Sequence, residues 1–253
     1  MNEANQITQA TKLYGFIAEE AQQNRFAVTL NKRFKAAGDD AMMIPMNIRP
    51  DDFHFTLSNM KQSHVNGAVI GAEYQEAALE IVDSASPLCE KAGLCDTVTL
   101  SEGRMHGELL LPSALKTAAE ESRARKIALI GSSPLVGAML LRLEGSEVSV
   151  FDPWIEALMA LQERLGSNID INRLAEGMQV DLSGYDMLID LSDLNDLSMV
   201  STLPRLNVDL KPPRAFSALR QRCIELDAAY SGYDSLLETM TETVYNYLTK
   251  EQK

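Results

Sequence analysis

Residues 125–152 read RKIALIGSSPLVGAMLLRLEGSEVSVFD, and this stretch indicates the fold of the second half of the chain. The apolar run 127–130 has the length of a buried strand, and GSSP at 131–134 interrupts it. Apolar residues then recur at helical spacing over 135–143, and Pro134 suits the first turn of that helix. A second apolar run, 147–151, ends on Asp152. This succession, a strand, a tight turn, a helix and a second strand that ends on an acid, predicts the opening of a doubly wound dinucleotide-binding domain.

The turn after the first of these strands departs from the glycine-rich pattern that such domains use. Only Gly131 remains, because Ser133 and Val136 stand where further glycines are expected and add side chains where phosphates would lie. Pro134 also removes an N–H donor. The hydroxyls of Ser132 and Ser133 can still donate to an anion. We therefore expect either no dinucleotide or weak binding, with Gly131, Ser132 and Ser133 as the phosphate contacts.

The acid at the end of the second strand bears on the choice of dinucleotide. Asp152 is placed to hold a ribose 2′-hydroxyl. The same carboxylate would repel a 2′-phosphate, so we expect NAD if any dinucleotide binds, and NADP is disfavoured. The alternative is that Asp152 and Pro153 only cap the following helix.

Composition and charge exclude several classes of function. The formal net charge of −13 argues against a broad nucleic-acid surface and against binding to anionic membranes. The three cysteines and three histidines lack the spacing of a disulfide framework or a metal site, so no metal is expected. The sequence shows no signal peptide and no apolar run long enough to span a bilayer. We expect a soluble, cytoplasmic protein.

The remaining patterns predict an α/β fold with two domains. The first part should contain strands at 13–17, 41–46 and 67–71, a hairpin of 96–100 with 105–109, and helices at 26–37, 49–62, 73–84 and 86–93. The second part should continue from a charged helix at 113–126 to helices at 154–165 and 216–223 and strands at 187–190 and 205–210. We expect domains at 1–112 and 113–228, with the segment 229–253 packing back on the first through a helix at 233–248.

The order of these elements, together with a set of short motifs, resembles the shikimate and quinate dehydrogenase family. The motifs are YGFI at 14–17, QEAAL at 75–79, KAGLCDT at 91–97, EGRMHG at 102–107 and LIG at 129–131. Their order and spacing carry the resemblance, which covers almost the whole chain. It implies an N-terminal α/β substrate domain, a Rossmann-like doubly wound domain and a C-terminal helix that returns to the first domain.

The resemblance also implies where the working residues would fall, and the chain departs from the family at each position. The serines that hold the substrate carboxylate fall at 24–27, where no serine occurs, although Arg25 could meet a carboxylate there. The catalytic lysine falls on Gln75, which cannot transfer a proton at neutral pH. The other family positions are the catalytic aspartate near Leu111, an asparagine at Asp96 and a glutamine near Thr239. We therefore expect no catalytic residue of the family type and a divergent member that has lost shikimate dehydrogenase activity.

Polar residues at these positions suggest that a cleft between the domains still binds a small polar ligand. The candidates are Asn24, Arg25, Gln75, Asp96, Glu108 and Tyr233. The first hypothesis is a non-catalytic small-molecule binding or regulatory protein. The second is an NAD-dependent oxidoreductase for a different polar substrate, with Asp96, Glu108 or Tyr74 as acid or base. The third is a structural partner of another enzyme. The partner stays open between a second copy of the chain and another enzyme.

One further acidic segment follows a predicted strand. Residues 188–196 read LIDLSDLND, which could coordinate a cation or begin a solvated loop. The segment lacks the glycine and the terminal glutamate of a calcium-binding EF-hand loop, and the pattern favours the solvated loop.

Overall fold

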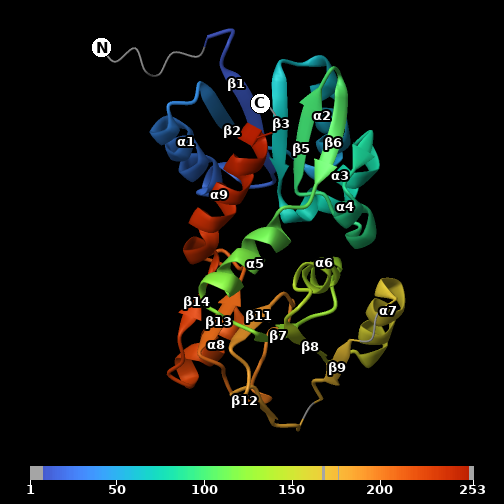
Figure 1. The fold of residues 1–253 in the computed structure, drawn as a ribbon, viewed down its shortest axis with the longest axis vertical. Helices are drawn as coiled ribbons and strands as arrows, with labels where there is room; N and C mark the ends of the chain where they lie inside the picture. The colour runs from blue at the N-terminus through green and yellow to red at the C-terminus, as the bar shows by residue number, and fades with distance from the viewer. Residues whose placement is uncertain (1–7, 167–168, 176, 251–253) are drawn as a thin grey trace. The chain divides into compact units, whose positions relative to one another are not determined.

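The computed structural model describes residues 8–166, 169–175 and 177–250 (Figure 1). Contacts divide the chain into two units: unit 1 comprises Met1–Leu111 with Met240–Lys253, and unit 2 comprises Pro112–Thr239. Both units combine strands with helices, as the sequence pattern predicts for an α/β protein. No helix in the described part of the chain is long and apolar enough to cross a membrane.

Unit 1 is built on one mixed sheet. Its strands are β1 (Lys12–Ala18), β2 (Ala41–Asn47), β3 (Val65–Ile70), β4 (Ser84–Ala85), β5 (Thr97–Ser101) and β6 (Arg104–Glu108), in the order β2-β1-β3-β5-β6-β4. β1 is parallel to β2 and β3, whereas β5 is antiparallel to β3 and β6. The β5–β6 turn has positive φ at Glu102 (52°) and Gly103 (74°), which fits the tight hairpin that the sequence predicts.

The helices of unit 1 begin and end where local signals place them. They are α1 (Phe26–Ala37), α2 (Pro50–Asn59), α3 (Gln75–Ile81) and α4 (Pro87–Ala92). α1 ends at Gly38 in the left-handed conformation, and the Ser86 side chain caps α4 by accepting a hydrogen bond from the Cys89 N–H. Short 3₁₀ turns at Ala21–Gln23, Met60–Gln62 and Ala72–Tyr74 complete the connections.

Two helices cross the boundary between the units: α5 (Leu111–Glu121) and α9 (Tyr233–Lys250). Within unit 1, the last turns of α9 lie beside α1 (Figure 1). Arg33 donates two hydrogen bonds to the Glu242 carboxylate, from Nε at 2.5 Å and from Nη2 at 3.1 Å. Its guanidinium carbon also lies 3.8 Å from the centre of the Tyr245 ring. A two-pronged ion pair and a stacked aromatic ring therefore join α9 to α1.

Unit 2 has the strand order of a doubly wound domain. Its main sheet contains β7 (Lys126–Ile130), β8 (Glu147–Asp152), β9 (Asp170–Arg173), β11 (Met187–Asp190), β13 (Leu206–Asp209) and β14 (Tyr230–Ser231), in the order β14-β13-β11-β7-β8-β9. All neighbours in this sheet are parallel. The chain order reverses between β7 and β11, and open sheets of this kind bind ligands at the carboxyl ends of the strands beside such a point.

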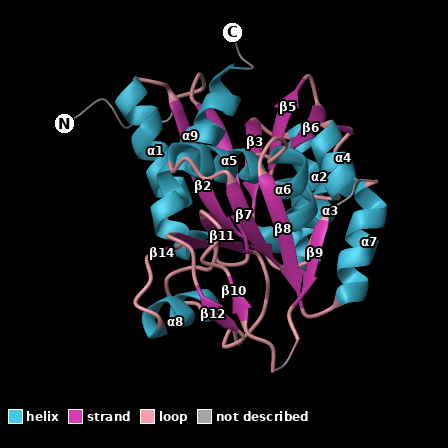
Figure 2. Ribbon diagram, turned by 60° about the horizontal axis from the view of Figure 1, so that its bottom comes forward, coloured by secondary structure: helices cyan, strands magenta, loops and turns pink. Residues whose placement is uncertain are grey.

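Helices cover the strands of unit 2 and bury its centre (Figure 2). They include α6 (Pro134–Arg142), α7 (Ile155–Leu165) and α8 (Ala218–Glu225). Residues 127–130 of the central strand have no exposed surface, which agrees with a strand covered on both faces. A second, two-stranded parallel sheet pairs β10 (Val180–Asp181) with β12 (Val200–Thr202).

Several boundaries differ from the sequence prediction. The helix expected over 113–126 ends at Glu121, because Arg123 adopts a left-handed backbone (φ 59°) and Lys126 already belongs to β7. The helices expected over 49–62 and 73–84 are shorter and adjoin 3₁₀ turns. The short strands β4, β9, β10, β12 and β14 were not predicted, because two to four residues cannot establish a periodic pattern.

Candidate functional site

The strongest site signal in unit 2 is the turn that leaves β7. The Gly131 N–H donates to the Phe151 carbonyl at 2.8 Å, and Gly131 has φ of +120°, a conformation that side chains rarely adopt. A Cβ added at Gly131 would lie 3.1 Å from the Leu191 carbonyl oxygen and 3.2 Å from the Ser192 nitrogen. Glycine is therefore required at this position, as in the first turn of a dinucleotide-binding domain.

The residues after Gly131 form the N-terminus of α6. Ser132 and Ser133 are partly exposed, and no hydrogen bond among the described residues uses their N–H groups. Ser133 is the N-cap, and its side chain makes no capping hydrogen bond. Two N–H groups and two hydroxyls thus remain available at the positive end of a nine-residue helix, which is the chemistry that holds a phosphate.

Two further residues of α6 change the interpretation of the missing glycines. Val136 is fully buried, so its side chain does not stand where a phosphate would lie, and that expectation is wrong. A Cβ added at Gly137 would lie 2.8 Å from Arg164 Nη2 and 3.2 Å from Leu161 Cδ1 of α7. The close packing that the last glycine of the pattern permits is therefore provided by Gly137, one position later.

Asp152 is held by its own loop. Its Oδ1 accepts a hydrogen bond from the Trp154 N–H at 2.8 Å, and the residue is only 5% exposed. This bond precedes α7 without capping it, because the N-cap of α7 is Trp154. The Asp152 carboxylate is thus already occupied on one side, and its mere presence does not decide which ribose the domain accepts.

A second carboxylate shapes the floor of the Gly131 turn. Asp190, the last residue of β11, is 4% exposed and accepts hydrogen bonds from the Ser192 N–H (3.0 Å) and hydroxyl (2.6 Å). These bonds hold Ser192 against Gly131. Burial raises the pKa of Asp190. The interpretation of 188–196 as the beginning of a solvated loop is therefore wrong for Asp190, although Asp193 and Asp196 are exposed.

Asp209 lies next to Asp190, in register on β13, and is completely buried. It accepts hydrogen bonds from the hydroxyls of Ser217 and Tyr230 and from the Lys211 N–H. Burial, and then the bond to Asp209, raise the pKa of Tyr230 to about 12. No group of three or more His, Cys, Asp or Glu residues that could hold a metal ion occurs among the described residues. The donors around Asp209 indicate a structural role.

In unit 1, three of the predicted cleft residues lie at one end of the sheet. Gln75 begins α3, Asp96 precedes β5, and Glu108 ends β6. Backbone hydrogen bonds connect them: the Cys95 N–H donates to the Gln75 carbonyl, and the Asp96 N–H donates to the Glu108 carbonyl, both at 3.0 Å. The chain thus brings together three residues that are far apart in sequence.

The side chains of these three residues are engaged within unit 1. Asp96 accepts from the N–H groups of Leu110 (2.9 Å) and Leu111 (2.7 Å) and from the Thr97 hydroxyl (2.9 Å). Its carboxylate therefore caps the N-terminus of α5. The Ser86 hydroxyl donates to Glu108 at 2.5 Å, and Gln75, only 7% exposed, donates to a strand carbonyl at 3.4 Å.

Burial governs the ionisation of Asp96. It raises the pKa of this carboxyl group from 3.8 to about 6, against the hydrogen bonds from Leu110, Leu111 and Thr97, which favour the charged form. The same side chain could in principle exchange a proton near neutral pH. The three donors that surround it favour a helix cap instead.

The other candidates lie elsewhere. The Tyr74 hydroxyl donates to the Ile48 carbonyl at 2.6 Å, and its ring stacks on Phe53 with 4.3 Å between ring centres. Asn24 accepts from the Phe26 N–H at 2.8 Å, and Arg25 beside it is exposed. Tyr233 begins α9 in unit 2 and is partly exposed.

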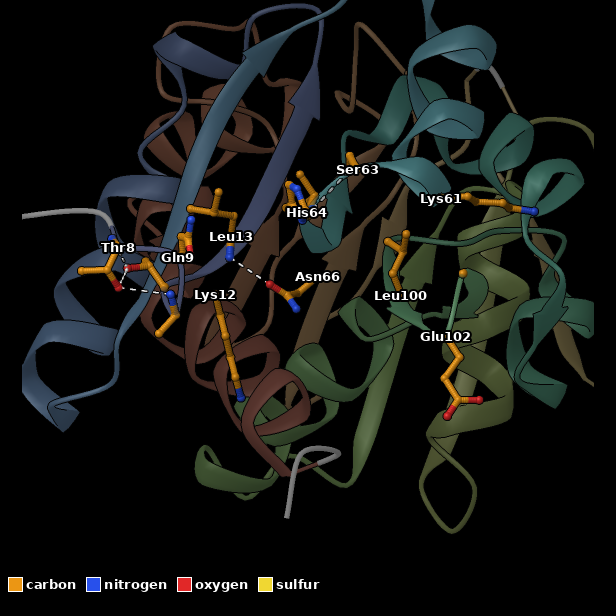
Figure 3. A pocket seen from close by; sticks show the side chains of 14 residues that line it. Thr8, Gln9, Lys12, Leu13, Lys61, Ser63, His64, Asn66, Leu100 and Glu102 are labelled. Atoms are coloured by element: carbon orange, nitrogen blue, oxygen red, sulfur yellow. Dashed lines mark hydrogen bonds between the residues drawn. The ribbon is translucent and has the colours of Figure 1, made fainter.

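A pocket that the sequence analysis missed lies at the opposite end of the unit 1 sheet from Gln75 and Asp96. Its volume is about 860 Å³, and its lining includes Lys12, Lys61 and His64 (Figure 3). Asn66 on its wall accepts a hydrogen bond from the Leu13 N–H at 3.0 Å. None of the predicted site residues lines this pocket. Glu102 and Gly103 do line it, but the sequence marked them only as a hairpin turn and as part of the EGRMHG motif.

Comparison with known proteins finds shikimate dehydrogenases among the sequence relatives of this chain. No protein-family model matches the chain. A shikimate dehydrogenase (NADP(+)) of Thermococcus kodakarensis is 25% identical over 237 residues, which are 92% of this chain and 82% of that protein. The corresponding enzyme of Shouchella clausii is 22% identical over 236 residues, with coverage of 90% and 82%.

Solved structures agree on the fold. A shikimate dehydrogenase in complex with NADP+ has a TM-score of 0.79 at 16% identity and covers 98% of this chain and 93% of its own. The shikimate dehydrogenase of Aquifex aeolicus also has a TM-score of 0.79, at 17% identity, with coverage of 96% and 94%. The predicted fold class is confirmed: an α/β fold that matches the two-domain shikimate dehydrogenase structure, including its Rossmann-like domain.

The comparisons overturn the expectation about the cofactor. NADP was disfavoured on the basis of Asp152, but the relatives are named for NADP(+) and one structural neighbour holds it. That expectation is wrong. The physical reason is that the Asp152 carboxylate is buried and its Oδ1 accepts a hydrogen bond from the Trp154 N–H of its own loop, so the presence of an acid at this strand end does not by itself exclude a 2′-phosphate.

Proposed function

We propose that this chain, whose relatives are shikimate dehydrogenases, is a shikimate dehydrogenase-like protein that does not oxidise shikimate and instead binds a small polar molecule. One observation carries the proposal. Gln75, which the family resemblance places at the catalytic lysine, is a buried amide at the end of the unit 1 sheet where Asp96 and Glu108 also lie.

Oxidation of an alcohol requires a group that accepts the hydroxyl proton while the hydride leaves. An amide cannot accept that proton at neutral pH. Asp96 is occupied by three donors, and Glu108 accepts the Ser86 hydroxyl and the Leu109 N–H. Without a positioned base, the rate should fall by about 10²–10⁴ relative to an enzyme that has one.

The same contacts weigh against an oxidoreductase that uses a rearranged set of acids and bases. Its candidate groups were Asp96, Glu108 and Tyr74, and each of them serves the local structure. Tyr74 in particular donates its proton to a backbone carbonyl, and burial raises its pKa, so it is not poised to act as a base. The binding hypothesis needs none of these groups to transfer a proton.

For unit 2, we propose that NADP(H) is the ligand, because the relatives are named for it and the turn after β7 fits a dinucleotide phosphate. Gly131 would let the backbone approach the pyrophosphate, and the N–H groups and hydroxyls of Ser132 and Ser133 would bind its oxygens. A nicotinamide exchanges a hydride in enzymes that also position a base; in this chain, which is proposed to lack that base, the dinucleotide would be bound without oxidation of shikimate. The residues of this chain would hold and orient it.

The test measures activity and binding on the same full-length protein. Production of NADPH from NADP+ and shikimate is followed at high protein concentration, with a shikimate dehydrogenase as the positive control. Thermal unfolding is recorded with NADPH, with shikimate and with other small polar acids and polyols. We expect no shikimate-dependent NADPH, and stabilisation of about 2.7 kcal/mol at a ligand concentration 100 times its Kd. Turnover of shikimate at about 1 s⁻¹ or faster, an ordinary enzyme rate, would overturn the proposal.

A further inference from the structure

An exposed arginine in unit 2 lies beside the acid that sequence reasoning used against NADP. Arg173 is the last residue of β9 and is the register partner of Asp152, the last residue of β8. The Leu174 N–H donates to the Asp152 carbonyl at 3.0 Å, so the carboxyl ends of the two strands are joined directly after this pair. Residues in register on neighbouring strands point to the same face of a sheet, so both side chains start from one face.

None of the described residues pairs with the Arg173 side chain. The side chain is exposed, and no hydrogen bond or ion pair connects it to another residue in the described part of the chain. Its neighbour Asp152 is buried and holds the Trp154 N–H instead. The carboxyl end of this edge strand therefore presents a guanidinium group that no described residue engages, and its donors match the oxygens of a phosphate.

An exposed aromatic side chain follows the same strand end. Trp154 is 69% exposed although it is the largest apolar side chain in the protein, and it lies two residues after Asp152. It is also the only tryptophan in the chain. An exposed indole ring after the end of β8, the strand that pairs with the strand of Arg173, is suited to cover a nucleotide base.

From these positions we infer that Arg173 and Trp154 form the subsite for the adenosine 2′-phosphate of NADP(H). In doubly wound domains the adenosine ribose lies at the carboxyl end of the second strand, which is β8 here. Arg173 binds the 2′-phosphate from the neighbouring strand β9, and Trp154 covers the adenine ring. The inference rests on the proposed binding of NADP(H) to unit 2 and names the residues that select it over NAD(H).

Because Trp154 is the only tryptophan, its fluorescence reports binding without an added label. The protein is titrated with NADPH and with NADH, and the Kd of each is obtained from the change in tryptophan emission. Arg173→Gln should weaken NADPH binding about tenfold or more, as expected for the loss of one charge-assisted contact, and should leave NADH binding unchanged. Arg125→Gln removes the same charge at the opposite end of the same sheet, before β7, and should change neither value.

Calorimetry with Trp154→Ala completes the test, since this variant lacks the fluorophore. It should weaken NADPH and NADH binding by the same factor, because both carry an adenine. Equal weakening of the two dinucleotides by Arg173→Gln would overturn the subsite and leave the proposed function standing. Failure of the unaltered protein to bind either dinucleotide would overturn the subsite together with the proposed binding of NADP(H) to unit 2.

Discussion

The Asp96→Asn variant tests whether a buried carboxylate at the start of α5 is a structural cap. Burial raises the pKa of Asp96 from 3.8 to about 6 in the folded protein. Between these two values the folded protein holds a proton that the unfolded chain has released. The free energy of unfolding must therefore fall as the pH rises through 6.

The magnitude follows from the size of the pKa shift. One pKa unit corresponds to about 1.36 kcal/mol. A pH of 5 lies about one unit below the pKa of Asp96 in the folded protein. Asp96 therefore makes the folded protein about 1.4 kcal/mol more stable at pH 5 than at pH 7.5. Asn cannot titrate. Its NH₂ group replaces one acceptor oxygen and faces the N–H donors of Leu110 and Leu111, which should lower the free energy of unfolding by about 1–3 kcal/mol at any pH.

The assay is urea unfolding of both proteins at pH 5 and pH 7.5, with the free energy extrapolated to water. Asp96→Asn should be less stable at both pH values, and its deficit should be about 1.4 kcal/mol larger at pH 5. Asp51→Asn, which changes an exposed acid in the first turn of α2, is the control and should show the same difference at both pH values. A deficit of Asp96→Asn that does not change with pH, or one larger at pH 7.5, would refute the reasoning.

Three further predictions concern packing and reactivity. Gly67→Ala places a methyl group against the Val98 carbonyl and should lower the free energy of unfolding by about 1–3 kcal/mol. Gly184→Ala meets open space and should change it by less than about 0.5 kcal/mol. Urea unfolding of both variants measures the difference. Tyr74→Phe keeps the stack on Phe53 but loses the bond to Ile48, and should cost about 1 kcal/mol while NADPH binding is unchanged. The thiols should resist Ellman's reagent in the folded protein and react in guanidinium, because all of them are buried: Cys89, Cys95 and Cys223. Rapid reaction of any one in the folded state would contradict the last prediction.

Local signals predicted the elements whose causes are local. The GSSP turn, the hairpin at Glu102 and Gly103, and the cap at Ser86 each depend on residues within four positions of one another. The strands of the doubly wound sheet were predicted where apolar runs are long enough. β9 reads DINR and has no buried residue, so neither length nor periodicity marks it. Its place at the sheet edge comes from pairing with β8, which a single sequence does not display.

The role of Asp96 illustrates why the candidate site was only partly predictable. The position was identified through the resemblance, and the structure places it beside Gln75 and Glu108. Its hydrogen-bond donors, however, lie 14 and 15 residues further along the chain, at Leu110 and Leu111. From the sequence alone, which does not show the path of the intervening hairpin, an aspartate that faces a cleft cannot be told apart from one that caps a helix. The prediction that Asp96 contacts a ligand therefore stays a prediction, whereas its role in capping α5 follows directly from the contacts.

The error about NADP has the same origin and leads to a more general point. Asp152 stands where an acid selects NAD, and its neighbours in sequence offer no opposing charge. Folding changes both parts of that inference. The Trp154 N–H binds the acid, and strand pairing brings Arg173, 21 residues away in the numbering, into register beside it. In the subsite proposed above, two adjacent strand ends together would set the charge that a 2′-phosphate meets. If Arg173→Gln weakens the binding of NADPH and not of NADH, a specificity rule that considers only the acid at the end of β8 predicts the wrong dinucleotide for this chain.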